Sequence, residues 1–223
     1  MIPYVLCHTI LSLTPLRALT YTLLALTDAS GLPPASSTAD PAYTVPAIHH
    51  VPTNSYIMDS YAIAKFLETT YPSTKYRALP LHSEVGDEIV SKAAAALDPV
   101  FGPCLTPTEI TMLSPRAQVY FRTTREKMFG CKIEELISGD KAEQIWAGAA
   151  TEIQRVNAIV EKQKESSRGP FLFGKEPTFS DFVIAGALQS ARAIDQGVFE
   201  RTMGYPGFKG IYEACEPYMA KKD

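Results

Sequence analysis

The sequence predicts a small α/β domain in residues 1–75 and an all-α domain in residues 82–223. Two short β-favouring runs followed by a helical pattern, at residues 47–68, indicate a mixed α/β region. The stretch YPSTKYRALP that follows contains prolines and has no helical period, as is typical of a linker. Beyond it, apolar residues recur at helical spacing towards the end of the chain. A sheet-containing part therefore precedes a purely helical one.

Composition and charge argue against nucleic acid or an anionic membrane surface as a partner. The 223 residues are 46% hydrophobic and 20% charged, which is ordinary for a globular protein, and the net charge is -3. The cysteines are scattered, without C-x-x-C spacing or neighbouring histidines, so no zinc site is expected. The four cysteines are Cys7, Cys104, Cys131 and Cys215, and we interpret them as buried thiols of a reducing compartment. We therefore expect a cytoplasmic protein, and we expect it to hold no metal.

The first 26 residues, MIPYVLCHTILSLTPLRALTYTLLAL, carry a single formal charge, at Arg17, which is also a feature of signal peptides and membrane anchors. They lack a basic start, and Pro15 and Arg17 interrupt the apolar run well short of the ~20 residues that a spanning helix needs. We therefore expect a buried strand at residues 2–11 and a helix at residues 15–26. The Pro- and Ser-rich loop after them offers no second strand, so the α/β domain is predicted to lack one strand.

Residues 47–68 are predicted to form a hairpin and then a helix. The runs 47–51 and 56–58 favour strands, and the turn-forming segment 52–55 separates them. The sequence DSYAIAKFLETTY follows, with apolar residues on one helical face, so a helix should begin near Asp59. Further helices are expected at residues 83–97, 114–129, 141–165, 180–194 and 206–219.

An X-Pro step, Val45 followed by Pro46, stands directly before the hairpin. An X-Pro bond adopts the cis form at modest cost, and a cis bond would turn the N–H and C=O of Val45 outward, where they can pair with a peptide-like ligand. The alternative is a trans proline that merely enters an edge strand.

An acidic residue and a serine, Asp59 and Ser60, stand at the predicted helix start. Free N–H groups and the dipole at a helix start attract a carboxylate, to which a serine hydroxyl can also donate. An aspartate can accept from an ammonium group, so the pair suits an amino-acid-like zwitterion. The alternative is that either residue only caps the helix.

The order of X-Pro step, hairpin and Asp-Ser helix start resembles the glutathione site of the cytosolic glutathione transferases. The resemblance implies that the main chain of Val45, beside Pro46, pairs with the cysteinyl part of glutathione. It implies that Asp59 and Ser60 bind the γ-glutamyl part. It also implies a thioredoxin-like first domain, here lacking one strand, and an all-helical transferase second domain.

Two later stretches extend the resemblance from about residue 31 to the C-terminus. FLFGKEPTFSDFVIAGAL is similar to the late helical signature of the family, in which Thr178 and Asp181 form the capping box of a buried helix. SPRAQVYFRTTREKMFGCKIEEL is similar to a helix of a fungal-specific class related to bacterial β-etherases. We assign the capping box a role in folding and none in chemistry.

The residue that activates the glutathione sulfur is predicted near the first helix. The segment TPLR, which begins at Thr14, loosely resembles the Ser-Pro-x-x-Arg helix start of such enzymes, and Ser12 lies close by. A hydroxyl at a helix N-terminus can donate to the sulfur and favour the nucleophilic thiolate. An ordinary N-cap is the alternative for Thr14. Cys7 and Tyr4, whose residue types perform this role in other classes, are interpreted as core.

The resemblance implies an enzyme, a glutathione transferase in which the thiolate of the co-substrate glutathione attacks hydrophobic electrophiles, by conjugation or ether cleavage, in detoxification. Phe101, Tyr120 and Phe121 are candidates for the wall of the substrate site, although core packing explains them equally well. The expected partners are glutathione, a small hydrophobic substrate and a second copy of the chain. The alternatives are a non-catalytic protein of the same fold that binds glutathione or an apolar ligand, and a chain left inactive by its incomplete first domain.

Overall fold

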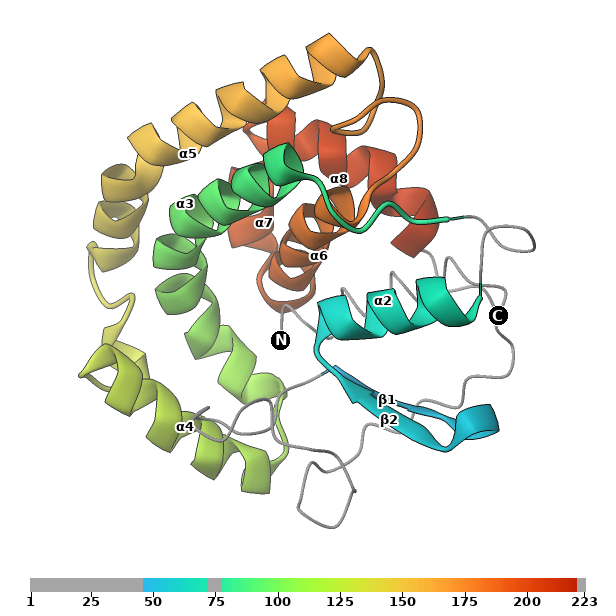
Figure 1. The fold of residues 1–223 in the computed structure, drawn as a ribbon. Coiled ribbons are helices and arrows are strands. Elements are labelled where there is room, and N and C mark those ends of the chain that lie inside the picture. Colours follow the sequence, from blue (N-terminus) through green and yellow to red (C-terminus); the bar gives the residue numbers. More distant parts are fainter. Residues whose placement is uncertain (1–45, 72–77, 220–223) are drawn as a thin grey trace.

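The computed structural model describes residues 46–71 and 78–219 and confirms the predicted fold class (Figure 1). In the described part of the chain, a two-stranded sheet and helix α2 (Ser60–Thr70) come first, and the later elements are helical. The helices after α2 are α3 (Glu84–Glu109), α4 (Pro115–Phe129), α5 (Lys141–Ser167), α6 (Phe179–Ile194), α7 (Gln196–Met203) and α8 (Pro206–Met219).

Several features predicted from the sequence fall outside the described residues. They are the strand at residues 2–11, the helix at residues 15–26, and the side chains of Tyr4, Cys7, Ser12, Thr14 and Val45. These stay predictions.

The predicted hairpin is present as β1 (Ala47–His50) and β2 (Ser55–Met58), which pair antiparallel so that the first residue of β1 lies opposite the last residue of β2. The turn starts one residue earlier than predicted, because Val51 opens a short 3₁₀ turn. Asn54 closes that turn in the left-handed region, at φ 50°, which asparagine tolerates better than most residues. The hairpin thus ends in a defined turn.

A buried histidine fixes the turn end of the hairpin to α2. His50 is 2% exposed, and its Nδ1 lies 2.6 Å from the hydroxyl oxygen of Thr53. Its Nε2 lies 2.8 Å from the hydroxyl oxygen of Tyr71, the residue that ends α2. Since both ring nitrogens have partners, the hairpin is anchored at the end opposite to Pro46.

Helix α3 continues to Glu109, well past the predicted end at Leu97, and this part of the prediction was wrong. An internal proline removes a backbone hydrogen bond and clashes with the preceding turn, so it usually ends a helix. Pro99, Pro103 and Pro107 recur at every fourth residue and therefore lie along one side of α3. The helix curves instead of ending (Figure 1). The buried apolar residues among these prolines, which hold this part of α3 in the core, are Val100, Phe101, Cys104 and Leu105.

Helix α7 is an element that the sequence pattern missed. Asp195 follows the last residue of α6, and its side chain accepts a hydrogen bond of 3.0 Å from the N–H of Val198. One residue therefore ends α6 and caps the next helix, which spans only eight residues.

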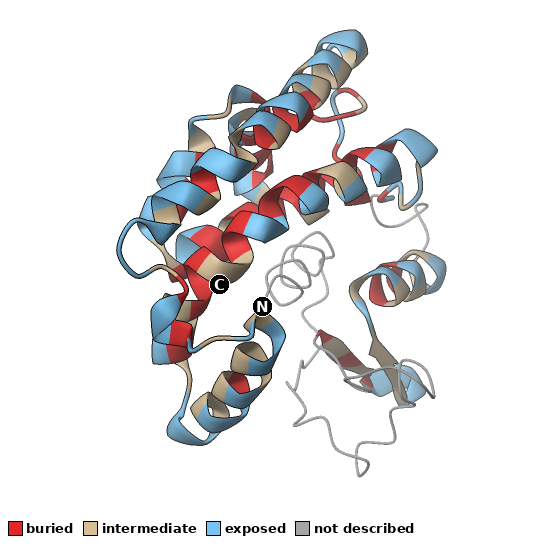
Figure 2. Ribbon diagram, turned by 90° about the vertical axis from the view of Figure 1, so that its left-hand side faces the viewer, coloured by how far each residue is buried: buried red, intermediate tan, exposed pale blue. Residues whose placement is uncertain are grey.

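Helix α6 forms the centre of the helical part, where it contacts α3, α7 and α8. Phe182 and Leu188 of α6 are both 0% exposed, and Phe208 of α8 is equally buried. In Figure 2 the buried residues gather on the facing sides of the helices. None of the helices within residues 46–71 and 78–219 combines the length and apolar character that a membrane span requires.

Candidate functional site

Pro46 and Asp59 meet at the open end of the hairpin. The main-chain N–H of Asp59 donates to the carbonyl oxygen of Pro46, with 3.2 Å between nitrogen and oxygen. Pro46 is buried, whereas Asp59 is exposed. The structure therefore brings together the X-Pro step and the Asp-Ser helix start, which the whole hairpin separates in the sequence.

Asp59 caps α2 from an unusual backbone conformation. Its φ of 81° lies in a region that residues other than glycine rarely adopt. Its Oδ1 accepts from the N–H groups of Tyr61 and Ala62, both at 3.0 Å, so the capping role is confirmed. Its Oδ2 has no hydrogen-bond partner among the described residues. Strained backbone of this kind is concentrated at functional sites. The second carboxylate oxygen of Asp59, Oδ2, is therefore available to a ligand.

Ser60 is the first residue of α2 and is half-buried. As the first helical residue, it has an N–H group without a partner inside the helix. Its hydroxyl hydrogen-bonds to no group in the part of the chain that the structure describes. Ser60 thus offers two donors beside the free oxygen of Asp59, an arrangement that can hold a carboxylate next to an ammonium group.

Tyr61 connects this corner to the helical part, and sequence reasoning missed it. Its ring meets the ring of Phe179 edge-on, with centroids 5.6 Å apart, and Phe179 is the first residue of α6. The N–H of Phe179 in turn donates to the carbonyl of Pro80 at 2.9 Å. Tyr61 is 43% exposed, and nothing in the sequence around it indicates a contact with a residue so far along the chain.

Thr178 and Asp181 form the predicted capping box at the start of α6. Asp181 is 0% exposed, and its Oδ2 accepts from the N–H of Thr178 at 2.8 Å and from the hydroxyl of Thr178 at 2.7 Å. Its Oδ1 accepts from the N–H of Leu172 at 2.8 Å. Burial raises the pKa of the Asp181 carboxyl, and these hydrogen bonds oppose that rise. The box therefore fixes the loop before α6 as well as the helix start.

Comparison with known protein families gives a match in the helical part of the chain. The model of the glutathione S-transferase C-terminal domain matches residues 89–202, a little over half of the chain. The chain belongs to the glutathione S-transferase family.

Relatives of known sequence or structure agree with this membership. The glutathione S-transferase-like protein ustS of Aspergillus flavus is 26% identical over 192 residues, which cover 79% of this chain and 68% of that protein. The crystal structure of glutathione transferase GSTFuA3 from Phanerochaete chrysosporium matches with a TM-score of 0.78 and 24% identity, over 100% of this chain and 91% of that one. A glutathione S-transferase of Ceriporiopsis subvermispora, solved in complex with glutathione, matches with a TM-score of 0.75 and 20% identity, over 100% and 92% of the two chains. The two solved structures establish the shared fold.

The three predicted wall residues occupy different environments in this glutathione S-transferase family member. Phe101 is 3% exposed in the main core, and Phe121 is 7% exposed in a small separate cluster with Ile110 and Ile133. Tyr120 is 65% exposed. Core packing is therefore the better interpretation of Phe101 and Phe121, and Tyr120 is the one of the three that presents its ring at the surface.

Two of the described cysteines, Cys104 and Cys215, are buried and are poor nucleophiles. Burial raises the pKa of the Cys104 thiol to about 11, and it raises the pKa of the Cys215 thiol as well. Both thiols are therefore protonated at neutral pH. Among the residues that the structure describes, no three His, Cys, Asp or Glu side chains are placed to hold a metal ion.

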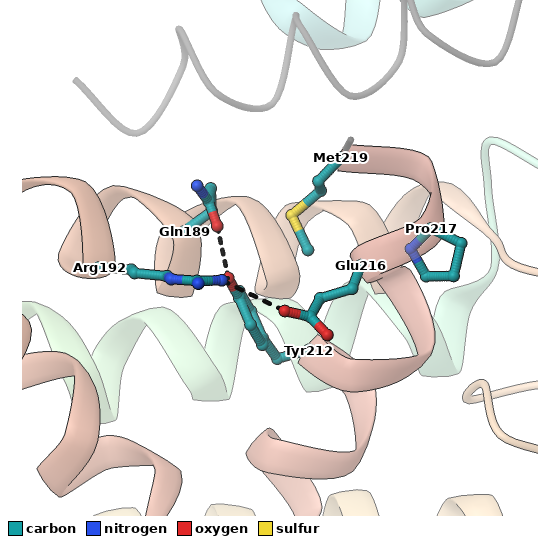
Figure 3. Close-up of a pocket in the computed structure, with 6 residues that line it drawn as sticks. All are labelled: Gln189, Arg192, Tyr212, Glu216, Pro217 and Met219. Carbon is teal, nitrogen blue, oxygen red and sulfur yellow. Dashed lines mark hydrogen bonds and ion pairs between the residues drawn. The ribbon is translucent and has the colours of Figure 1, made fainter. Parts of the chain in front are cut away.

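A cavity of about 430 Å³ lies between α6 and α8 (Figure 3). The hydroxyl of Tyr212 donates to Oε1 of Gln189 at 2.5 Å and accepts from Nη1 of Arg192 at 2.8 Å. The same Nη1 lies 3.2 Å from Oε1 of Glu216. Because these polar groups pair with one another and the lining includes no residue of the hairpin or α2, we do not assign glutathione to this cavity.

Proposed function

We propose that this chain binds glutathione at the corner formed by Val45, Pro46, Asp59 and Ser60 and directs its thiolate at hydrophobic electrophiles, by conjugation or ether cleavage. The observation that carries the proposal is the hydrogen bond of 3.2 Å from the Asp59 N–H to the Pro46 carbonyl, because it holds the two halves of the corner together. Family membership supports glutathione as the ligand, as does its presence in the Ceriporiopsis subvermispora structure of the same fold.

Each residue of the corner has a separate task in this proposal. Oδ2 of Asp59 accepts from the ammonium group of the γ-glutamyl part, while Oδ1 continues to cap α2. The N–H and hydroxyl of Ser60 donate to the carboxylate of the same part. The main chain of Val45 pairs with the cysteinyl part.

The proposal is tested by retention on immobilised glutathione together with a thiol-conjugation assay on the full chain. We expect both retention and turnover. Retention without turnover would support the non-catalytic binding protein, and failure of both would remove glutathione as the ligand.

Replacement Ser60→Ala is expected to weaken glutathione binding about tenfold, the effect of one hydrogen bond to a charged group. The melting temperature should stay unchanged, because the hydroxyl has no partner among the described residues. Titration calorimetry with glutathione measures the first effect and thermal unfolding the second. Unaltered affinity would contradict the assignment of the γ-glutamyl carboxylate to Ser60.

Activation of the sulfur is proposed for Thr14, with Ser12 as the second candidate. Removing the correct hydroxyl, by Thr14→Val or Ser12→Ala, is expected to lower kcat at least about tenfold, because a positioned donor to developing charge is lost. The pH profile of kcat/KM should move to higher pH, since less thiolate forms at neutral pH. Full turnover in both variants would exclude this mode of activation.

Family membership also supports a homodimer that acts in detoxification in the cytoplasm, with residues 1–75 and 82–223 as its two domains. Light scattering of the purified chain measures the assembly, and a monomeric mass would remove the dimer from the proposal.

A further inference from the structure

A smaller cavity, of about 220 Å³, lies where the segment before α3 meets the start of α6. It is separate from the proposed glutathione corner, because neither Asp59 nor Ser60 lines it. The residues around it are Pro80, Leu81, His82, Ser83, Phe173, Glu176, Thr178 and Ser180.

Ser180 gives this cavity a hydroxyl group that makes no hydrogen bond within the described part of the protein. It is 3% exposed, and its hydroxyl hydrogen-bonds to no group within residues 46–71 and 78–219. Helix α3 closes over it through Gly86, where an added Cβ would lie 2.5 Å from the Ser180 oxygen. The Ser180 oxygen is not among the fully buried unpaired atoms, so it is reachable from the cavity, where its hydroxyl can donate to or accept from a bound molecule.

The surroundings disfavour a charged ligand of either sign. Helices α3 and α6 both begin at the cavity, and the positive ends of their dipoles repel a cation. Glu84 and Asp87 occupy the first turn of α3, where their carboxylates oppose the attraction of the helix ends for an anion. His82 does not attract an anion into the cavity, because its Nδ1 lies 2.6 Å from Oδ2 of Asp87 and is paired with that carboxylate.

The rest of the lining determines the shape of the ligand. Pro80, Leu81 and Phe173 supply apolar surface, and the Ser180 hydroxyl supplies one unused hydrogen bond. We propose that this cavity binds a small neutral molecule that carries one hydroxyl or carbonyl group on an apolar body. The polar group pairs with the Ser180 hydroxyl, and the apolar body lies against the Phe173 ring.

The test is titration calorimetry of the full chain with four probes of one shape: benzyl alcohol, toluene, benzoate and benzylamine. Benzyl alcohol is expected to bind about three- to tenfold more tightly than toluene, which is the effect of one neutral hydrogen bond. Benzoate and benzylamine should bind more weakly than benzyl alcohol. A charged probe that binds best would overturn the proposal.

Three variants test whether benzyl alcohol binds in this cavity. Ser180→Ala should reduce the affinity for benzyl alcohol to that for toluene, while toluene binding stays unchanged. Ser190→Ala is the matched control, because Ser190 is a buried serine of the same helix without a hydrogen-bond partner and lies outside the cavity. Leu81→Trp, in the segment before α3, should fill the cavity and abolish binding while retention on glutathione is kept. Equal benzyl alcohol binding by the wild type, Ser180→Ala and Leu81→Trp would place the ligand elsewhere and refute the inference.

Discussion

Replacing Asp181 with alanine is expected to lower the free energy of unfolding by about 4 kcal/mol, because several buried donors lose their acceptor together. The side chain is fully buried and accepts from the N–H of Leu172 and from both donors of Thr178. Without it, the start of α6 loses its cap, and the loop before the helix loses its attachment. Urea denaturation followed by circular dichroism measures the loss.

Two milder variants separate the contributions within the capping box. Asp181→Asn keeps the shape and one acceptor for Leu172 but places an amide donor opposite the donors of Thr178, so an intermediate loss is expected. Thr178→Val removes one hydroxyl and should cost about 1 kcal/mol. Equal stability of Asp181→Ala and the wild type would show that the capping box does not stabilise the fold.

Replacing Asp59 with asparagine is expected to weaken glutathione binding up to about a hundredfold, while the stability of the fold remains close to that of the wild type. Asparagine keeps a side-chain oxygen to cap the N–H groups of Tyr61 and Ala62, and at this backbone conformation it is no more strained than aspartate. It loses the negative charge that the proposed ammonium contact requires. Calorimetric titration with glutathione and thermal unfolding measure the two properties independently.

The companion variants Asp59→Gly and Asp59→Ala test the backbone part of this argument. Glycine relieves the conformation at φ 81° and loses the cap at small cost, so Asp59→Gly should fold normally. Alanine loses the cap and keeps the strain, and Asp59→Ala should be destabilised by about 2 kcal/mol. If Asp59→Asn bound glutathione as tightly as the wild type, the carboxylate would not hold the ammonium group.

The periodic parts of the chain were predictable, because their apolar pattern and end signals agree. Helix α5 begins at Lys141 and α8 spans Pro206–Met219, as the sequence indicates. The capping box and the hairpin were also confirmed, since turn and cap residues act within a few positions of each other. Local chemistry was therefore a sufficient guide to these elements.

Prediction from the sequence failed where packing between distant residues outweighs the local conformational preference of a residue. Pro99 predicts the end of α3, but the buried residues beyond it keep the chain helical. In the candidate site, the cap of Asp59 on α2 followed from its position, whereas the contact between Tyr61 and Phe179 joins residues more than a hundred positions apart. Such a contact has no local signature, and neither does the cavity beside Ser180, because each depends on how α6 lies against the segments before it.

The prolines of α3 have a consequence for how this protein opens. Each proline costs an interior helix about 3 kcal/mol relative to alanine, so the part of α3 that contains Pro99, Pro103 and Pro107 has no helical stability of its own. This part of α3 stays helical only while its buried side chains pack against the neighbouring helices of the core. In hydrogen exchange, its remaining amides should therefore lose protection together with those of α6, as one cooperative unit.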